Sequence, residues 1–221
     1  MKEIVFIGHL GLGDHVISQG IVNILAPKYK NVWLPVKHHN ISSVAHMCRD
    51  LDNVYYIPCK SDDEIFDFQI ISNFQNAEIL CVGHRNPTWE QRDTIHFDQY
   101  FYKQAAIDFE ESWNWQSKDG HETEKIAKLI PNEPFCFVHD DVARGYSISP
   151  DTTLTQIRNS IAADTIFDYL PLLRRATEIH CIDSCFALMI DRANINCKKY
   201  MYSNLRTSEV LSTYKNGWEF V

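Results

Sequence analysis

The chain has 221 residues, 45% of them apolar, which is enough to bury a core as one large domain or two small ones. Its net charge of −8, without a lysine- or arginine-rich stripe, argues against a nucleic-acid partner. No apolar run reaches the roughly 18 residues of a transmembrane segment, and the start of the chain lacks the pattern of a signal peptide. Seven cysteines, an odd number without CxxC pairs, favour reduced thiols over disulfides, so we expect a cytoplasmic protein.

The first 26 residues predict a strand, a glycine-rich turn and a helix. Ile4–Ile7 is a short, β-branched apolar run, typical of a strand buried on both faces of a parallel sheet. Apolar residues then recur at helical spacing over Val16–Leu25. The turn between them lies at the carboxyl end of its strand, where open α/β sheets hold their ligands. Its three glycines let a ligand approach the backbone, and the helix start offers unpaired N–H groups to an anion. These glycines are Gly8, Gly11 and Gly13.

Asp14 distinguishes this turn from an ordinary dinucleotide loop. An acid at this point repels a phosphate and suits the acceptance of a proton. Gly13-Asp14, after a first strand and before a helix, resembles the opening of the ADP-heptose–lipopolysaccharide heptosyltransferase family, where a Gly-Asp pair in this loop carries the catalytic base. The resemblance implies that Asp14 is the general base and that Gly11 and Gly13 help to bind the donor. The alternative from the residues is that Asp14 caps the helix, a role that does not exclude catalysis.

Three further strands are predicted in the first half, separated by helices. Pro35 indicates that the strand Asn31–Val36 ends early or lies near a sheet edge. Pro58 closes the strand Val54–Ile57. Helices are expected over Ile41–Cys48 and from the acid-rich Ser61–Glu64. This alternation predicts a parallel sheet with right-handed crossovers. The strands are Asn31–Val36, Val54–Ile57 and Glu78–Val82.

His84 and Arg85 follow the last of these strands, again at a carboxyl end. They could bind an acceptor or a phosphate, and together with His15 we assign them to the acceptor. The further alternative for His84 and Arg85 is a solvated pair in a loop. Phe97–Phe109 has the spacing of an amphipathic helix that packs on the core. The polar stretch 110–124 indicates a linker, which divides the chain into domains 1–120 and 121–221.

The second half begins with an expected helix, Glu122–Ile130, and a buried strand, Pro134–His139. The pattern of a strand that ends in His139 and is followed by Arg144-Gly145 resembles the segment that binds the donor diphosphate in the second domain of the same transferases. An arginine fork matches phosphate oxygens bidentately, which a lysine cannot do. The adjacent pair Asp140-Asp141 beside one histidine is weak evidence for a metal, so no metal site is expected.

The most specific resemblance lies further on, in a pattern of helix, Arg-Ala, apolar strand, Asp-Ser and helix. It is similar to the donor-binding core of the heptosyltransferases and of their wider two-domain class, GT-B. The resemblance implies that hydroxyl and backbone N–H groups at Asp183, Ser184 and Cys185 contact the diphosphate. The family usually has glycine at the position of Cys185 and histidine at that of Leu188. The elements are a helix Thr165–Ala176, a strand Glu178–Ile182 and a helix Phe186–Asp191.

The end of the chain completes this prediction. Lys198–Tyr202 is expected to be the last strand and Ser208–Tyr214 a short helix before the tail. The second half then holds few strands, which suggests that at least one βα unit is missing.

The resemblance implies an α/β fold of two Rossmann-like domains, a compact GT-B-like protein whose parallel sheets face a central cleft. The first domain would hold a glycan acceptor and the second a nucleotide-diphosphate-sugar. The expected enzyme is an inverting, metal-independent glycosyltransferase that needs no cofactor besides its donor substrate. Two alternatives stay open: an NADP-dependent oxidoreductase, in which Lys37 accepts the 2′-phosphate, and a nucleotide-sugar-binding module without catalysis.

Overall fold

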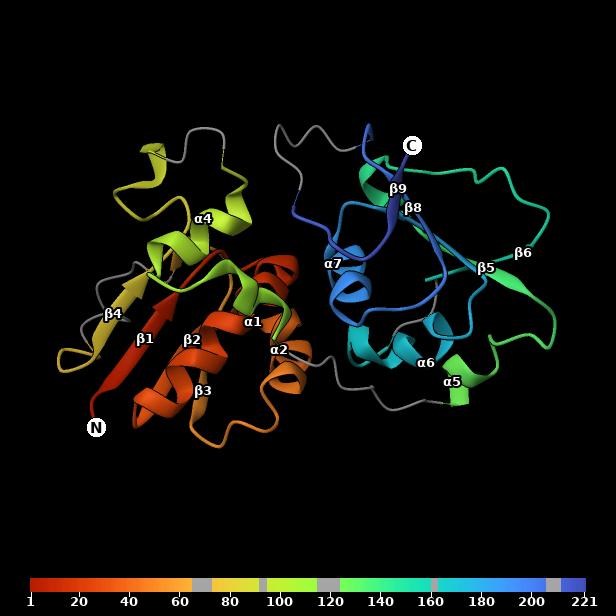
Figure 1. The fold of residues 1–221 in the computed structure, drawn as a ribbon. Coiled ribbons are helices and arrows are strands. Elements are labelled where there is room, and N and C mark those ends of the chain that lie inside the picture. The colour runs from red at the N-terminus through yellow and green to blue at the C-terminus, as the bar shows by residue number, and fades with distance from the viewer. Residues whose placement is uncertain (65–72, 92–94, 115–123, 160–162, 206–211) are drawn as a thin grey trace. The chain divides into compact units, whose positions relative to one another are not determined.

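The computed structural model describes residues 1–64, 73–91, 95–114, 124–159, 163–205 and 212–221. The chain divides into two compact units, Met1–Trp115 and Gln116–Val221 (Figure 1). Each unit is an α/β structure built on its own parallel sheet. None of the helices in the described ranges is long and apolar enough to cross a membrane.

The sheet of the first unit has the order β3-β2-β1-β4, with every neighbouring pair parallel. The predicted strands are therefore confirmed, and β1 lies inside the sheet. All four residues of Ile4–Ile7 are at most 4% exposed, as expected of a strand covered on both faces. The strands are β1 Glu3–Ile7, β2 Asn31–Lys37, β3 Val54–Cys59 and β4 Glu78–Cys81.

The expectation that Pro35 shortens its strand or marks an edge is wrong. β2 lies between β1 and β3, and Pro35 pairs in register with Ile57. A proline removes only one donor from the ladder. Its neighbours Leu34 and Val36 are buried, and this burial keeps β2 in the interior of the sheet. Pro58 likewise lies within β3 instead of ending it.

Helix α1 (Leu12–Leu25) crosses the first sheet and contacts α2 (Ile41–Met47), α4 (Phe97–Gln104) and the 3-10 helix η5 (Phe109–Trp113) (Figure 1). Contact with η5 is close because a Cβ on Gly20 would overlap the carbonyl oxygen of Glu111. The Tyr102 hydroxyl donates to the Ile17 carbonyl over 2.8 Å. Short 3-10 helices complete the unit: η1 Ala26–Lys28, η2 His38–Asn40 and η4 Trp89–Gln91.

The helix predicted over Phe97–Phe109 is shorter in the structure. α4 ends at Gln104, Ala106 takes a positive φ of 53°, and the Ile107 N–H returns to the Tyr102 carbonyl over 3.0 Å. This left-handed turn ends the helix. The 3-10 helix η5 then occupies the start of the predicted linker. The helix expected to begin at Ser61 falls largely outside the described residues.

The second unit is organised around a parallel sheet of order β6-β5-β7-β8-β9. Its helical elements are α5 (Glu124–Ala127), η6 (Val142–Arg144), η7 (Ile166–Tyr169), α6 (Leu170–Leu173) and α7 (Cys185–Arg192). The strands are β5 Phe135–His139, β6 Thr155–Arg158, β7 Glu178–Ile182, β8 Lys198–Tyr202 and β9 Trp218–Phe220.

Several expectations for this half are wrong. It does not hold few strands, because β6 and β9 join the three strands that were predicted, and Lys198–Tyr202 is not the last of them. The segment Thr165–Ala176 forms η7 followed by α6 instead of one helix. The helix expected over Ser208–Tyr214 lies mostly outside the described residues, and its described end, 212–214, is not helical. The helix predicted from Glu122 ends at Ala127 instead of Ile130.

Candidate functional site

Asp14 lies in the first turn of α1, but it is not the N-cap. Gly11 occupies that position with extended backbone angles, and no side chain caps the helix there. The Asp14 carboxylate folds back over Gly11, where a Cβ would overlap Oδ2. Glycine at position 11 leaves room for the carboxylate in this orientation, and a larger residue there would make the Asp14 side chain move. The capping alternative for Asp14 is not what the structure shows, and the acid is instead placed at the positive end of the helix dipole.

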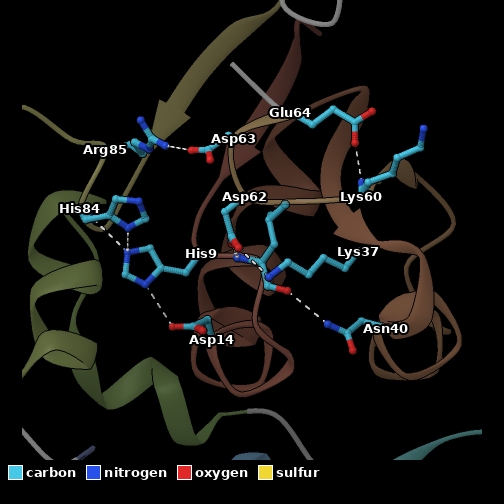
Figure 2. Close-up of polar contacts among 11 residues, drawn as sticks. His9, Asp14, Lys37, Asn40, Lys60, Asp62, Asp63, Glu64, His84 and Arg85 are labelled. Carbon is cyan, nitrogen blue, oxygen red and sulfur yellow. Dashed lines mark hydrogen bonds and ion pairs between the residues drawn. The ribbon is translucent and has the colours of Figure 1, made fainter. Parts of the chain in front are cut away.

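His9 connects Asp14 to His84 (Figure 2). Its Nδ1 lies 3.3 Å from Oδ1 of Asp14. Its Nε2 accepts a hydrogen bond of 2.9 Å from the backbone N–H of His84 and lies 2.6 Å from Nδ1 of the His84 ring. Two of the predicted site residues, Asp14 and His84, are thus brought together through a third that the sequence analysis did not select.

The ring of His9 is held by the residues that surround it. A Cβ on Gly83, which has a φ of +86°, would overlap the ring, and the Gly83 N–H donates to Oε1 of Gln104 over 2.7 Å. Phe101 and Trp89 contact the ring edge-on, with centroids 4.9 and 5.7 Å away. The aromatic contacts and the close approach of Gly83 restrict the orientation of the His9 ring.

The next residue, Leu10, is hydrogen-bonded through both of its backbone groups. Its N–H donates to Oδ1 of Asp62 over 2.9 Å, and its carbonyl accepts from Asn40 over 3.1 Å. Burial raises the pKa of Asp62, but bonds from Lys37 and from the Leu10 N–H outweigh it, so this pKa lies below its ordinary value. Asp62 is therefore ionised at neutral pH and pairs with Lys37 over 2.5 Å.

His15 and Arg85, both assigned to the acceptor, differ in their surroundings. Burial lowers the pKa of His15 to about 4, so its ring is neutral at pH 7. Within the described part of the chain, its Nε2 is buried and has no hydrogen-bond partner. Arg85 forms an ion pair with Asp63 beside the His84 ring (Figure 2). Burial lowers the pKa of His84 too, and the nearby His9 and Arg85 lower it further.

In the second unit, a cavity of about 170 Å³ lies where β6 ends and α7 begins. Its wall includes two aromatic rings, Tyr169 and Phe186, and Phe186 stacks on His139 with ring centroids 4.3 Å apart. His139 is the last residue of β5, so carboxyl ends of neighbouring strands meet here. The residues that line the cavity are Asn159, Ala163, Thr165, Ile166, Tyr169 and Phe186.

The Asp183-Ser184-Cys185 segment begins α7 beside this cavity. Ser184 is the N-cap, and its hydroxyl accepts from the Ala187 N–H over 3.4 Å. Cys185 is the first residue of the helix and is partly exposed. Asp183 is buried and accepts a hydrogen bond from the Tyr214 hydroxyl. The resemblance thus selected a true helix start, with Phe186 one residue beyond it in the cavity wall.

Arg144 and Gly145 lie on the loop after β5. The Arg144 side chain is 69% exposed and pairs with Asp141 over 2.9 Å, while Gly145 ends η6 with a φ of +84°. Asp140 pairs with Arg158 and accepts from the Ile148 N–H. Both acids of the Asp-Asp pair are thus engaged by arginines. In the described ranges, no three His, Cys, Asp or Glu residues gather as ligands for a metal.

Comparisons with known proteins identify the fold. No family model matches the chain, and no curated protein does either. A solved glycosyl transferase family 9 protein from Veillonella parvula DSM 2008 aligns with 100% of this chain and 85% of its own, at a TM-score of 0.57 and 8% identity. The E. coli heptosyltransferase WaaC with ADP aligns with 99% of this chain and 92% of its own, at a TM-score of 0.53 and 9% identity. The chain has the fold of these transferases.

The residues of the candidate site that the sequence analysis missed are His9, Asp62 and Gly83. His9 carries a signal that could have been used, since it lies two residues after the end of a buried strand, at the sheet edge where ligands bind. Asp62 lies in a segment selected only for its capacity to start a helix. Its bond to Leu10, 52 residues away, depends on how β1 and β3 are placed in the sheet.

Proposed function

We propose that the protein is a glycosyltransferase that moves a sugar from a nucleotide-diphosphate-sugar to a glycan hydroxyl, with Asp14 as the general base. The observation that carries this proposal is the placement of Asp14. It lies in the first turn of α1, beyond the carboxyl end of the inner strand β1, does not cap its helix, and contacts His9. A carboxylate without a structural capping task, at the edge where α/β sheets bind ligands, is suited to proton transfer.

In the proposed reaction, Asp14 takes the proton of the acceptor hydroxyl as its oxygen attacks the anomeric carbon. The bond from that carbon to the donor phosphate breaks, and its electron pair leaves with the diphosphate. A single attack assisted by one base inverts the anomeric centre. His84 and Arg85 lie on the loop that follows β4, where His84 contacts His9. They would help to orient the acceptor.

The second unit would bind the donor. The cavity has aromatic walls at Tyr169 and Phe186, which suit a flat base or ribose, and lies at the start of α7, whose N–H groups suit a diphosphate. Binding of ADP by the E. coli heptosyltransferase WaaC supports a nucleoside diphosphate as the leaving group. Arg144, whose side chain is 69% exposed and pairs with Asp141, would exchange that carboxylate for the diphosphate. It and the α7 start would then stabilise the charge of the leaving group, so the proposed chemistry needs no metal. The GT-B arrangement, with acceptor and donor domains around a cleft, is part of this proposal.

The oxidoreductase alternative is disfavoured by the environment of Lys37. That lysine would have to bind the 2′-phosphate of NADP, but it is paired with an ionised Asp62 in the first unit. A phosphate would therefore meet a neutralised cation and a nearby carboxylate, which would repel it.

Thermal shifts with ADP, UDP, GDP, NAD and NADP would separate the candidates, because a ligand that binds only the folded state stabilises it. At a concentration 100 times its Kd, a nucleotide adds about 2.7 kcal/mol. We expect one nucleoside diphosphate to raise the melting temperature and NADP to leave it unchanged. A shift with NADP alone would contradict the transferase. Release of nucleoside diphosphate from ADP-glucose, UDP-glucose or GDP-mannose would then separate an enzyme from a binding module.

A further inference from the structure

Each nitrogen of the His9 ring faces a different partner, a hydrogen-bonded amide at Nε2 and a carboxylate oxygen at Nδ1. Nε2 faces the backbone N–H of His84 at 2.9 Å, while Nδ1 faces the Asp14 carboxylate at 3.3 Å. A backbone amide is a donor at every pH, so Nε2 must be the acceptor in this contact. A neutral imidazole carries one proton, which must then be on Nδ1, the atom that faces Asp14.

This arrangement selects one tautomer of the ring through a group that no side-chain substitution can remove. The His84 ring adds a second contact, because its Nδ1 lies 2.6 Å from the same Nε2. With a lone pair on Nε2 of His9, the His84 ring must carry its proton on Nδ1. Phe101, Trp89 and Gly83 then restrict the rotation of the His9 ring.

The two oxygens of Asp14 are differentiated as a result. Oδ1 faces the Nδ1 of His9, and Oδ2 lies over Gly11, where no Cβ occupies the space. Among the described residues, no hydrogen bond engages Oδ2. The Asp14 side chain is 23% exposed, which leaves the carboxylate within reach of a small polar group.

We propose that His9 is a positioning residue: its Nδ1–H holds Oδ1 of Asp14 and thereby aims Oδ2 at the acceptor hydroxyl. The proposal rests on the proposed function, in which Asp14 is the base. During transfer, the hydroxyl proton passes to Oδ2 while the acceptor oxygen bonds to the anomeric carbon and the diphosphate departs. His9 keeps its own proton throughout and stabilises the carboxylate before the transfer. Substitution of His9 should therefore slow the chemical step without weakening the binding of the donor.

The tautomer can be tested without any substrate. Imidazole ¹⁵N NMR of the full chain at pH 7 should show the His9 proton on Nδ1 and a lone pair on Nε2. It should show the same in the Asp14→Asn variant, because the backbone of His84 sets this tautomer. A proton on Nε2 of His9 in the parent protein would overturn the proposal.

The rate is tested by four variants at positions 9 and 14: His9→Phe, His9→Asn, Asp14→Asn and the double variant of His9→Phe with Asp14→Asn. His9→Phe keeps an aromatic ring among Phe101 and Trp89 but loses both nitrogens. His9→Asn keeps an N–H donor close to the position of Nδ1. Turnover is followed as nucleoside diphosphate released from ADP-glucose, UDP-glucose and GDP-mannose with water as the acceptor, a reaction that also needs a base. His39→Phe, at an exposed histidine outside the site, is the control for the substitution itself.

We expect His9→Phe to lower kcat by roughly 10- to 100-fold, the effect of misplacing a catalytic group by about an ångström, with KM for the donor unchanged. His9→Asn should recover most of this loss. In an Asp14→Asn background, His9→Phe should cause no further loss, because the residue that it positions is already inactive. A purely structural role would lower the melting temperature and add to the effect of Asp14→Asn.

The outcomes separate the two proposals. If Asp14→Asn turns over at the parent rate, the base assignment fails and the role of His9 fails with it. If Asp14→Asn is slow while His9→Phe is as fast as the parent, only the role of His9 fails. Losses that simply add in the double variant would also overturn the positioning role.

Discussion

The hydroxyl of Tyr214 donates a hydrogen bond to the carboxylate of Asp183, the residue that precedes the cap of α7. Burial raises the pKa of Tyr214 well above its ordinary value, and the charge of Asp183 raises it further, so the hydroxyl stays protonated. At the other end of α7, Asp191 accepts from the backbone N–H of Asn216 over 2.9 Å and from the indole of Trp218 over 3.0 Å. The C-terminal segment is thus hydrogen-bonded near both ends of α7, and the start of this helix lies beside the candidate donor site.

Removing the Tyr214 hydroxyl should therefore destabilise the second unit. Tyr214→Phe leaves the buried carboxylate of Asp183 without this donor, and a hydrogen bond to a charged group contributes about 1.5–3 kcal/mol. We expect a loss of that size in the free energy of unfolding, measured by urea denaturation. Tyr55→Phe, at a tyrosine that is 42% exposed, should stay within about 0.5 kcal/mol of the parent. Equal stabilities for the two variants would show that the Tyr214 bond contributes little.

Gly83 and Gly145 form a natural pair for separating backbone strain from a steric clash. Both have a positive φ, +86° and +84°, but a Cβ on Gly83 would overlap the His9 ring, whereas one on Gly145 would meet nothing within 4 Å. Gly145→Ala should cost about 1–2 kcal/mol, the penalty for a left-handed alanine. Gly83→Ala should cost more and should also displace the His9 ring, visible as a change in its NMR signals. Equal costs and an unchanged His9 spectrum would contradict the close contact.

Much of the fold could be predicted because its strands are apolar runs. β1, β5 and β7 are almost wholly buried, and each can be recognised in the sequence by its β-branched or aromatic residues. β6 (TQIR) buries only Ile157 and β9 has three residues, so neither has a pattern to detect. β9 is positioned by bonds from Asp191, 27 residues before Trp218, which no local pattern encodes.

The candidate site was predictable only where it follows local rules. Asp14 and Ser184 stand at turns between a strand and a helix, and such turns can be read from glycines and capping residues. The contact between His9 and His84 spans 75 residues and depends on β1 and β4 being neighbours. Pairing between strands is a tertiary property, so the partner of His9 could not be found from its surroundings in the sequence.

The neutral His15 should make stability depend on pH. Its pKa of about 4 in the folded state lies below the ordinary 6.5, so the unfolded chain binds more protons between these values. The neutral His15 ring therefore makes its full contribution to the free energy of unfolding above pH 6.5. This contribution, about 3 kcal/mol in total, is lost as the pH falls toward 4. Since carboxylates also titrate there, the measurement is the difference in unfolding free energy between the parent and His15→Leu at pH 4.5 and 7. Relative to the parent, the free energy of unfolding of His15→Leu should be higher at pH 4.5 than at pH 7. The same difference at both pH values would contradict a buried neutral ring.

Asp14 is the residue on which the proposed chemistry depends, and two substitutions separate its possible roles. Because Gly11 is the N-cap, Asp14→Ala should lose no capping bond. It should lose the interaction of the carboxylate with the helix dipole, about 0.3–1 kcal/mol, and its contact with His9. Asp14→Asn keeps the size of the side chain and removes only the proton acceptor. If Asp14 is the base, release of nucleoside diphosphate should fall by about 10²–10⁴-fold in this variant. Its melting temperature and nucleotide affinity should stay close to those of the parent. Asp52→Asn, at an exposed acid in the same unit, should turn over at the parent rate. Parental turnover in Asp14→Asn would assign the base to another group, with His84, joined to Asp14 through His9, as the next residue to substitute.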